Sequence, residues 1–346
     1  MRALVYHGPK NMKIEQRPVP QPEAGQVRIR TAYAGICGSD VHGWLGITGR
    51  RTPPMVMGHE FSGVISALGE GVTDWKVGDR VTVHPMMSCG KCSYCAQGLT
   101  NLCTDRKLMG TMTYDGAFVD EFCVPAENLC ALPENVSLEV GALIEPFAVA
   151  YRGILHAGSV KGKTVMICGA GTIGLMALKV CKLLEAERVI VVDLSNDRLA
   201  LARKHGADVT INGTEDIHAI LTAAGLRDQI DVAVEAVGVT PTAQQTVAFV
   251  KTRGTIIWIG NNAPTVTVNM QSIVTRELQI FGSYIYTDAD FRECVQMLSE
   301  KPQDFSGIIS QVISVEQAQD VFEELSRGAT AKIKVLVDMC SVPNQA

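Results

Sequence analysis

Residues 164–174 have the sequence TVMICGAGTIG, in which a short apolar run leads into a glycine-rich segment. The three glycines follow the spacing G-x-G-x-x-G, which permits a tight turn, close approach of the backbone to a pyrophosphate, and close packing of a helix on a strand. A helix expected to begin near Thr172 offers free N–H groups to the anion. The segment therefore predicts a dinucleotide site. Its candidate cofactor-binding residues are Gly169, Gly171, Thr172, Ile173 and Gly174.

The next apolar run, RVIVVD at 188–193, ends in a carboxylate that supports this interpretation. Asp193 lies nineteen residues after Gly174, where it can accept hydrogen bonds from the adenosine ribose hydroxyls. An acid at this position repels the extra phosphate of NADP, so NAD is the expected cofactor. Arg198 is a further candidate that could soften this preference, or a surface residue of the next helix. The alternative is a structural glycine turn, with Asp193 as a helix cap.

Segments of strand and helix character alternate from residue 147 to residue 284. Continuous apolar character in the strands indicates burial on both faces, as in a parallel sheet covered by helices. The sequence thus predicts an α/β fold, with a doubly wound parallel-sheet domain at 147–284. Residues 1–146 are rich in short β-type runs separated by Gly, Pro and Asp, and residues 285–346 are mixed, so both are expected to form a second domain. The six predicted strands span 164–168, 188–193, 208–211, 230–236, 254–260 and 278–283.

The composition limits the classes of function. The chain has 346 residues, of which 47% are hydrophobic and 19% charged, values typical of a soluble enzyme of two domains. A net charge of −5 gives no electrostatic reason to expect a nucleic acid partner. No signal peptide is evident and no apolar run reaches the roughly 18 residues of a membrane span, so we expect a cytoplasmic protein without a membrane partner. Eleven cysteines then suggest reduced thiols and metal ligands.

Four of the cysteines lie in the segment CGKCSYCAQGLTNLC at 89–103, with the spacing C-x2-C-x2-C-x7-C. Four thiolates this close match the closed tetrahedral ligand set of a structural zinc. A disulfide cluster would need an oxidising compartment that nothing else in the sequence supports. A nucleic-acid zinc module would need basic and aromatic residues that the loop lacks. The predicted structural zinc ligands are Cys89, Cys92, Cys95 and Cys103.

A second zinc site is predicted from GICGSDVH at 35–42 and MGHEFSG at 57–63. Cys37 and His59 are its candidate ligands, and Glu60 and Glu145 are available as oxygen ligands or close neighbours. A catalytic zinc needs about three protein ligands and one open position, which a Cys, a His and a carboxylate provide. Alone, Cys37 and His59 would be interpreted as a buried thiol and an ordinary loop histidine.

These motifs, together with IEPFAVA at 144–150 and GAGTIG at 169–174, occur along the chain in the order found in one family. The sequence resembles the zinc-dependent medium-chain dehydrogenase/reductase family, in particular its sorbitol (polyol) dehydrogenase-like branch, near bacterial hexitol-phosphate or sugar-acid dehydrogenases. The resemblance implies a GroES-like catalytic domain at 1–146 and 285–346 and a Rossmann NAD-binding domain at 147–284. It also implies one catalytic and one structural zinc per subunit, and a homodimer or homotetramer.

The resemblance further implies roles for single residues. Cys37 and His59 would bind the catalytic zinc, with either Glu60 or Glu145 completing the ligand set. Ser39 matches the hydroxyl of the family's proton relay and His42 the histidine that ends the relay at solvent. Asp40 matches the acid that orients the ligand histidine. The implied activity is transfer of a hydride to NAD from a secondary alcohol of a polyol, polyol phosphate or sugar acid.

Three alternatives remain open at this stage. L-threonine 3-dehydrogenases share the Cys, the His and the two glutamates, so that activity is the nearest rival. A non-catalytic nucleotide-binding relative and an interaction module organised by the four-Cys loop are less consistent with the complete ligand set.

The resemblance is weaker for the choice of substrate. Gly282 and Ser283 replace the Arg-Tyr pair that contacts polyol hydroxyls in animal-type sorbitol dehydrogenases. Arg50 and Arg51 could instead bind a phosphate or carboxylate of the substrate.

Overall fold

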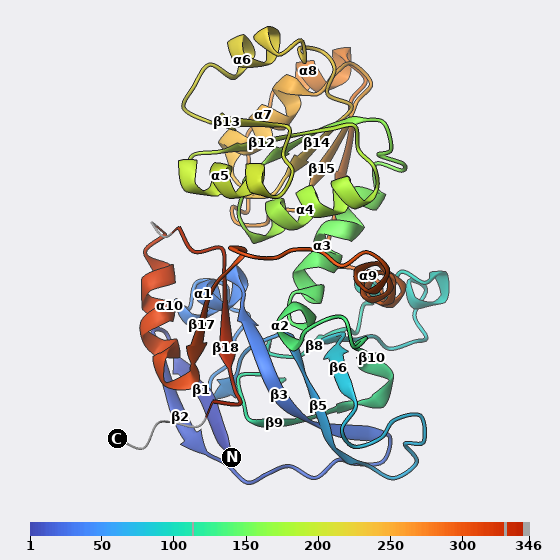
Figure 1. Ribbon diagram of the computed structural model, residues 1–346, viewed down its shortest axis with the longest axis vertical. Coiled ribbons are helices and arrows are strands. Elements are labelled where there is room, and N and C mark those ends of the chain that lie inside the picture. The colour runs from blue at the N-terminus through green and yellow to red at the C-terminus, as the bar shows by residue number, and fades with distance from the viewer. Residues whose placement is uncertain (113, 329–330, 342–346) are drawn as a thin grey trace. The chain divides into compact units, whose positions relative to one another are not determined.

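A computed structural model describes residues 1–112, 114–328 and 331–341 of the chain. The chain divides into two compact units, and the first is built from both ends of the sequence. Unit 1 comprises Met1–Glu145 and Thr287–Ala346, and unit 2 comprises Pro146–Tyr286 (Figure 1).

Unit 2 is organised around a parallel six-stranded sheet with the strand order β13-β12-β11-β14-β15-β16. This is the doubly wound order 3-2-1-4-5-6, so the strand order reverses between β11 and β14, where ligands of such sheets bind. Each strand lies within a residue or two of a predicted one, and the predicted fold class is confirmed. The strands are β11 (Thr164–Cys168), β12 (Arg188–Asp193), β13 (Val209–Asn212), β14 (Val232–Glu235), β15 (Thr255–Trp258) and β16 (Gln279–Gly282).

Helices cover this sheet, which explains the continuous apolar character of its strands. Successive side chains of a strand point to opposite faces, and all five side chains of β11 are buried, so both faces are covered. Helices α4 and α5 pack on β11, β12 and β13, while α7 packs on β11, β14 and β15 (Figure 1). The helices are α3 (Ile144–Leu155), within which unit 2 begins, α4 (Thr172–Leu183), α5 (Asn196–Lys204), α6 (Ile217–Ala223), α7 (Thr240–Phe249) and α8 (Met270–Thr275).

Unit 1 is built around a seven-stranded sheet whose central strand is β3 (Gln26–Ile36). β3 pairs antiparallel with β5 (Glu60–Leu68) on one side and with β18 (Lys334–Asp338) on the other. The pairing with β18 ties the C-terminal segment of the chain to the N-terminal one. The remaining strands of the sheet are β6 (Arg80–Val83), β9 (Glu121–Pro125), β10 (Leu129–Ala131) and β17 (Ile309–Ser314).

Smaller elements complete unit 1. A three-stranded sheet contains β1 (Arg2–Gly8), β2 (Asn11–Gln16) and β4 (Met55–Val56), and a ribbon contains β7 (Met86–Met87) and β8 (Lys107–Leu108). Its α-helices are α1 (Gly38–Trp44), α2 (Leu138–Gly141), α9 (Asp288–Glu300) and α10 (Ala318–Ser326). The 3-10 turns are η1 (Cys95–Gln97), η2 (Thr100–Leu102), η3 (Ala126–Asn128) and η4 (Val315–Gln317).

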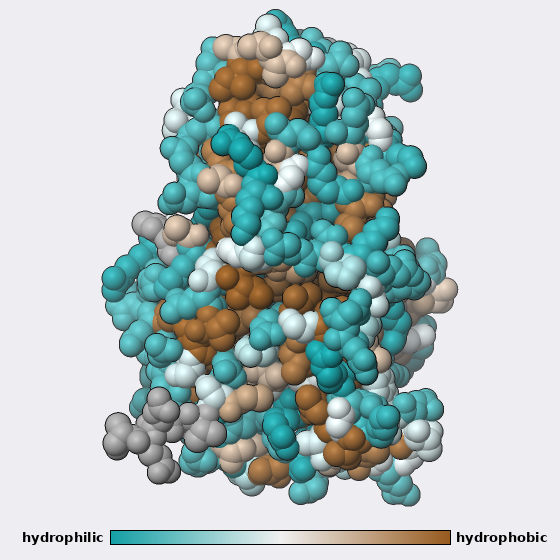
Figure 2. Space-filling view, in the orientation of Figure 1, coloured by the Kyte–Doolittle hydropathy of each residue, from teal (hydrophilic) through white to brown (hydrophobic). Residues whose placement is uncertain are grey.

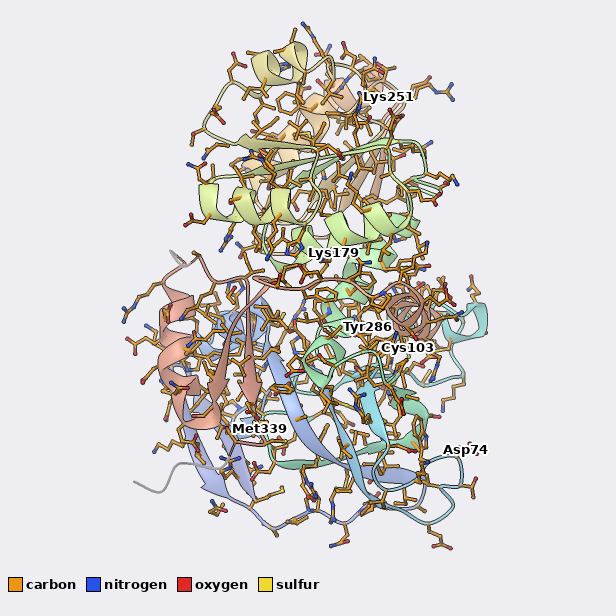
Figure 3. All side chains as sticks on the ribbon, in the orientation of Figure 1. Asp74, Cys103, Lys179, Lys251, Tyr286 and Met339 are labelled. Atoms are coloured by element: carbon orange, nitrogen blue, oxygen red, sulfur yellow. The ribbon has the colours of Figure 1, made fainter. Side chains whose placement is uncertain are left out.

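One hydrophobic core holds these elements together. Trp44 of α1 and Phe118 pack against Phe322 of α10. Met339, which follows β18 and is labelled in Figure 3, is buried in the same core. Hydrophilic side chains dominate the visible surface, with separate hydrophobic patches between them (Figure 2). None of the helices in the described part of the chain combines the length and apolar composition that a membrane crossing requires.

Candidate functional site

The first candidate metal site brings together Cys37, His59 and Glu60, whose ligand atoms lie within 4.8 Å of one another. Strand pairing explains the meeting. β3 and β5 are antiparallel neighbours in which Gly35 pairs with Glu60, so the residues just after β3 lie beside those just before β5. His59 and Glu60 are buried and Cys37 is half-buried. The structure thus assembles three of the four predicted ligand residues from two adjacent strand ends.

Asp40 connects the two predicted zinc ligands. Its Oδ2 accepts a hydrogen bond from the backbone N–H of Cys37 at 3.2 Å, and its Oδ1 lies 3.4 Å from Nδ1 of His59. The Asp40 side chain is fully buried, and Arg51 Nη2 donates to its Oδ1 at 2.9 Å. Burial by itself raises the pKa of Asp40, but the neighbouring His59 and Arg51 outweigh it and hold that pKa well below its usual range. Asp40 is therefore an anion placed behind the ligands.

Glu60 is held by a partner that sequence reasoning missed. Lys334 Nζ donates to both carboxylate oxygens of Glu60, at 2.6 and 2.9 Å, and to the carbonyl oxygen of Ile36 at 2.9 Å. A side chain at Gly35 would collide with Glu60, because an added Cβ would lie 2.2 Å from Oε2. Lys334 lies 274 residues from Glu60 and occupies a buried strand position, so no local pattern marks it.

Glu145, the other candidate carboxylate, lies in the first turn of α3 and is buried. It is not part of the group formed by Cys37, His59 and Glu60. Its charge nevertheless acts on Lys334. Burial lowers the pKa of Lys334, but the charges of Glu60, Cys37 and Glu145 outweigh burial and raise it. Both glutamates therefore stay close to the site, with Glu60 already engaged by a cation.

The charges at this site fit a divalent cation. With Cys37 as a thiolate, four negative groups face two cations, which leaves two negative charges, the charge that one Zn²⁺ carries. Cys, His and carboxylate are also the ligand types of zinc, with one position left open. The negative groups are Cys37, Asp40, Glu60 and Glu145, and the cations are Arg51 and Lys334.

The two predicted proton-relay residues lie on α1. Ser39 is exposed and His42 is half-buried, and a spacing of three residues places them on neighbouring positions of the helix surface. The two arginines proposed as anion binders differ. Arg50 is exposed, whereas the Arg51 side chain is only 3% exposed and its guanidinium donates to Asp40 and to the carbonyl oxygen of Arg50. Arg51 is thus occupied inside the protein.

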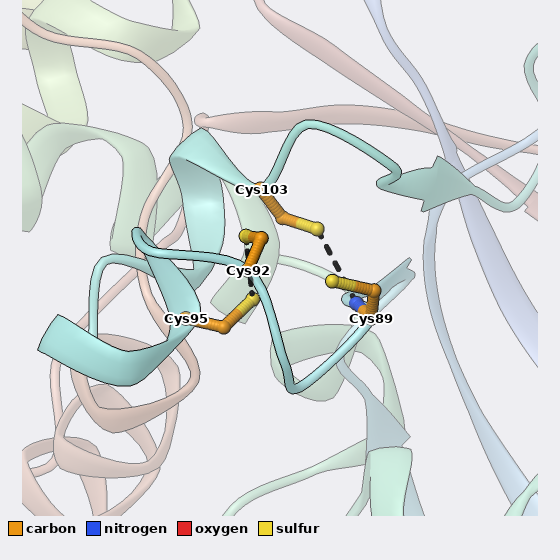
Figure 4. Close-up of side chains that lie close together, drawn as sticks. All are labelled: Cys89, Cys92, Cys95 and Cys103. Carbon is orange, nitrogen blue, oxygen red and sulfur yellow. Dashed lines mark hydrogen bonds between the residues drawn. The ribbon is translucent and has the colours of Figure 1, made fainter.

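The second candidate metal site contains the four cysteines of the loop between β7 and β8 (Figure 4). Sγ of Cys92 lies 3.5 Å from Sγ of Cys95, and the backbone N–H of Cys89 donates to Sγ of Cys103 at 3.3 Å. Tetrahedral zinc with Zn–S bonds of about 2.3 Å places sulfurs about 3.8 Å apart, close to what the loop presents. Backbone N–H groups of Cys95 and Thr104 lower the pKa of Cys92 to about 6. The loop fits the predicted structural zinc.

The predicted dinucleotide segment lies at the end of β11 in unit 2. β11 ends at Cys168, and Gly169 has a φ of 106°, a conformation that side chains rarely adopt. Gly171 is the N-cap of α4, which begins at Thr172 as predicted. An added Cβ on Gly174 would lie 1.8 Å from the carbonyl oxygen of Gly169, so only glycine allows this helix to begin so close to the strand. The free N–H groups of the α4 N terminus therefore follow the strand directly.

Asp193 is anchored to the same glycine-rich segment. It ends β12, its Oδ2 accepts the N–H of Ala170 at 2.7 Å, and its Oδ1 accepts the N–H of Ser195 at 2.8 Å. The N-cap of α5 is Ser195, whose hydroxyl accepts the N–H of Arg198. Asp193 is therefore not the helix cap that the structural alternative required. Arg198 lies half-buried in the first turn of α5.

Comparisons with known proteins agree with this arrangement. Residues 23–134 match the family model of the alcohol dehydrogenase GroES-like domain, and residues 172–300 match that of the zinc-binding dehydrogenases. D-xylulose reductase A of Aspergillus niger is 34% identical over 339 residues, which cover 95% of each chain.

Solved structures are similar over the whole chain. Galactitol-1-phosphate dehydrogenase of Escherichia coli has a TM-score of 0.91 at 29% identity, with 98% of this chain and 100% of that chain covered. L-idonate 5-dehydrogenase of Escherichia coli has a TM-score of 0.89 at 25% identity, with 97% of each chain covered.

Proposed function

Because this chain belongs to the zinc-dependent medium-chain alcohol dehydrogenase family, we propose that it transfers a hydride to NAD from a secondary alcohol of a polyol, polyol phosphate or sugar acid. The observation that carries the proposal is the group of Cys37, His59 and Glu60, which offers zinc a ligand set with an open position. The named relatives act on a ketopentose, a hexitol phosphate and a sugar acid, which supports a polyhydroxy substrate.

Cys37 and His59 would hold the catalytic zinc, and a carboxylate would complete the set. When bound, the zinc supplies a positive charge that lowers the pKa of a substrate hydroxyl. Glu60 shares its carboxylate with Lys334, so direct ligation by Glu60 would have to compete with that ion pair. Glu60 or Glu145 would therefore complete the zinc site, Glu60 in competition with Lys334 and Glu145 as the second carboxylate close to the site.

Ser39 and His42 would remove the proton that the substrate hydroxyl loses. Ser39 would accept that proton while its own hydroxyl proton passes on toward His42, which lies three residues further along α1 and would release a proton to solvent. Asp40, between them in sequence, faces the interior and takes no proton in this scheme, because Arg51 and the N–H of Cys37 occupy its oxygens. Ser39 and His42 would thus remove the proton, and Asp40 would orient the zinc ligands.

Gly169, Gly171, Thr172, Ile173 and Gly174 would bind the pyrophosphate of NAD, the carrier that accepts the hydride. Asp193 would bind the adenosine ribose, and its charge would disfavour the additional phosphate of NADP. Arg198 would contact the same end of the cofactor from α5. We further propose that the protein acts in the cytoplasm as a homodimer or homotetramer, with no nucleic acid or membrane partner.

The test is the absorbance of NADH formed with NAD and a panel of hexitols, pentitols, their phosphates, sugar acids, butanediol and L-threonine. Turnover on one polyhydroxy compound should disappear after chelation and return with zinc. Cys37→Ala and His59→Ala should abolish turnover while NAD binding survives. Retained turnover in either variant would refute the role of the metal site, and a preference for L-threonine would favour the rival activity.

A further inference from the structure

Arg51 is a fully charged side chain in the interior of unit 1 that the proposed reaction does not use. Its side chain is 3% exposed, and Nη2 donates to Oδ1 of Asp40 at 2.9 Å. Nη1 donates to the carbonyl oxygen of Arg50 at 3.2 Å, which fixes the guanidinium to the backbone of its own loop. A buried guanidinium requires a countercharge, and the anion that it contacts is the one behind the zinc ligands.

Asp40 and Arg51 are each the buried countercharge of the other. The Asp40 carboxylate has no exposed surface, and within residues 1–112, 114–328 and 331–341 the other polar groups recorded against it are the N–H of Cys37 and the ring of His59. Neither carries a permanent charge, since a histidine that binds zinc is a neutral imidazole. Arg51 is therefore the permanent countercharge of Asp40, and its hydrogen bond fixes the oxygen atom that faces Nδ1 of His59.

A glycine of α1 makes room for this arrangement. An added Cβ on Gly43 would lie 2.6 Å from Cγ and 3.2 Å from Nε of Arg51. Glycine inside a helix costs about 1 kcal/mol relative to alanine, so its presence on α1 has a steric reason rather than a helical one. The space that Gly43 leaves is filled by the aliphatic part of Arg51.

We propose that Arg51 is a positioning residue of the catalytic metal site, holding Asp40 against Cys37 and His59 so that both are oriented to bind zinc. The inference rests on the proposed function in one respect, that Cys37 and His59 bind the metal. Residues that orient zinc ligands through a hydrogen bond typically contribute about 10- to 100-fold in metal affinity. The same loss is expected when Arg51 is removed.

The experiment measures zinc retention by the full-length protein against graded concentrations of a chelator, with the ligand-field spectrum of the cobalt(II)-substituted protein as a second readout. Arg51→Met should release the metal of the Cys37 site at about 10- to 100-fold lower chelator strength and change the cobalt bands of that site. The four-Cys site serves as an internal reference and should keep its metal.

Arg51→Lys restores the charge without the fork of donors, so its zinc affinity should lie between that of Arg51→Met and that of the wild type. Arg50→Met, an exposed neighbour, should retain zinc like the wild type.

Gly43→Ala tests the same idea without removing the charge. It should displace Arg51 and weaken zinc binding although alanine favours the helix. It should have no further effect in an Arg51→Ala background, which removes the Cγ that the new methyl group would meet. Wild-type zinc retention and cobalt bands in Arg51→Met would overturn the inference, as would an equal effect of Gly43→Ala with and without Arg51. If the wild-type protein binds metal at the four-Cys site alone, the proposed function fails. If it binds metal at both sites and Arg51→Met changes nothing, only the role of Arg51 fails, so the two failures are distinguishable.

Discussion

Lys334 and Glu60 form a buried ion pair in which neither side chain is more than 2% exposed. Such a pair contributes little relative to apolar residues of the same size, but removing one partner leaves an uncompensated charge in the interior. In this chain the pair also occupies both carboxylate oxygens of a candidate zinc ligand. The charged side chains behind the candidate ligands therefore have defined partners, as the pairs Lys334–Glu60 and Arg51–Asp40 show.

Lys334→Met should lower the free energy of unfolding by about 3–5 kcal/mol, because Glu60 would remain buried without its cation. The measurement is the urea dependence of unfolding, compared with Lys334→Arg, which keeps the charge. Lys332→Met is the matched control. Its pair with Glu324 is partly exposed, so its loss should cost less than about 1 kcal/mol. Equal effects of the two Met variants would contradict a role for burial at Lys334.

The turn from β11 to α4 is the element that the glycine spacing describes most completely. Gly169 and Gly174 are required by backbone conformation and by close contact, whereas an added Cβ on Gly171 would meet no atom within 4 Å. Glycine is therefore required at the three positions for different structural reasons. Two of them allow the strand and helix to form, and the third leaves space for a ligand to approach.

Gly174→Ala should destabilise the protein by about 1–3 kcal/mol or more, because the new methyl group overlaps the carbonyl oxygen of Gly169. Gly171→Ala should leave the unfolding free energy unchanged but weaken NAD binding by at least about tenfold, or about 1.4 kcal/mol. The two variants are compared by urea unfolding and by titration of the protein's fluorescence with NAD. Wild-type NAD affinity in Gly171→Ala would place the pyrophosphate elsewhere.

At the scale of the whole molecule, unit 2 presents features expected of a subunit interface. β16 is an edge strand of the six-stranded sheet, and an edge with unpaired N–H and C=O groups is available to a second chain. Met270 and Val274, four residues apart on α8, are 75% and 62% exposed and lie on one side of that helix. We expect a second copy of the chain to cover them, since symmetric pairs are the commonest assemblies.

Light scattering after gel filtration should therefore give a molecular mass of two or four times the 37.2 kDa of one chain. Val274→Lys should shift the assembly toward the monomer, because a charge cannot be buried without a partner. Val77→Lys is the control, since Val77 is 61% exposed in unit 1 and outside the expected interface. A monomeric wild type, or dissociation caused equally by both substitutions, would contradict an interface at this surface.

Local pattern was sufficient to predict much of this protein. The apolar runs and the glycine spacing predicted the six strands, the start of α4 and the parallel sheet, because period and turn chemistry act over a few residues. The spacing of Cys89, Cys92, Cys95 and Cys103 predicted the group that the structure assembles, since a short loop brings its own thiols together. Cys37 and His59 were also predicted as ligands of one zinc from their motifs, whereas the roles of Ser39, Asp40 and His42 needed the resemblance to a family.

The tertiary structure alone determined how charge is distributed behind the candidate ligands. The sequence analysis gave Arg51 as a candidate binder of a substrate phosphate or carboxylate, but Arg51 lies inside unit 1 with Asp40. Lys334 gave no signal, yet the pairing of β18 with β3 brings it to Glu60 across 274 residues. A buried charge is stable only beside its countercharge, and that partner is chosen by strand register and packing rather than by distance along the chain. The sequence by itself therefore determined which groups are candidate ligands, and the folded chain determined which charged side chains lie behind them.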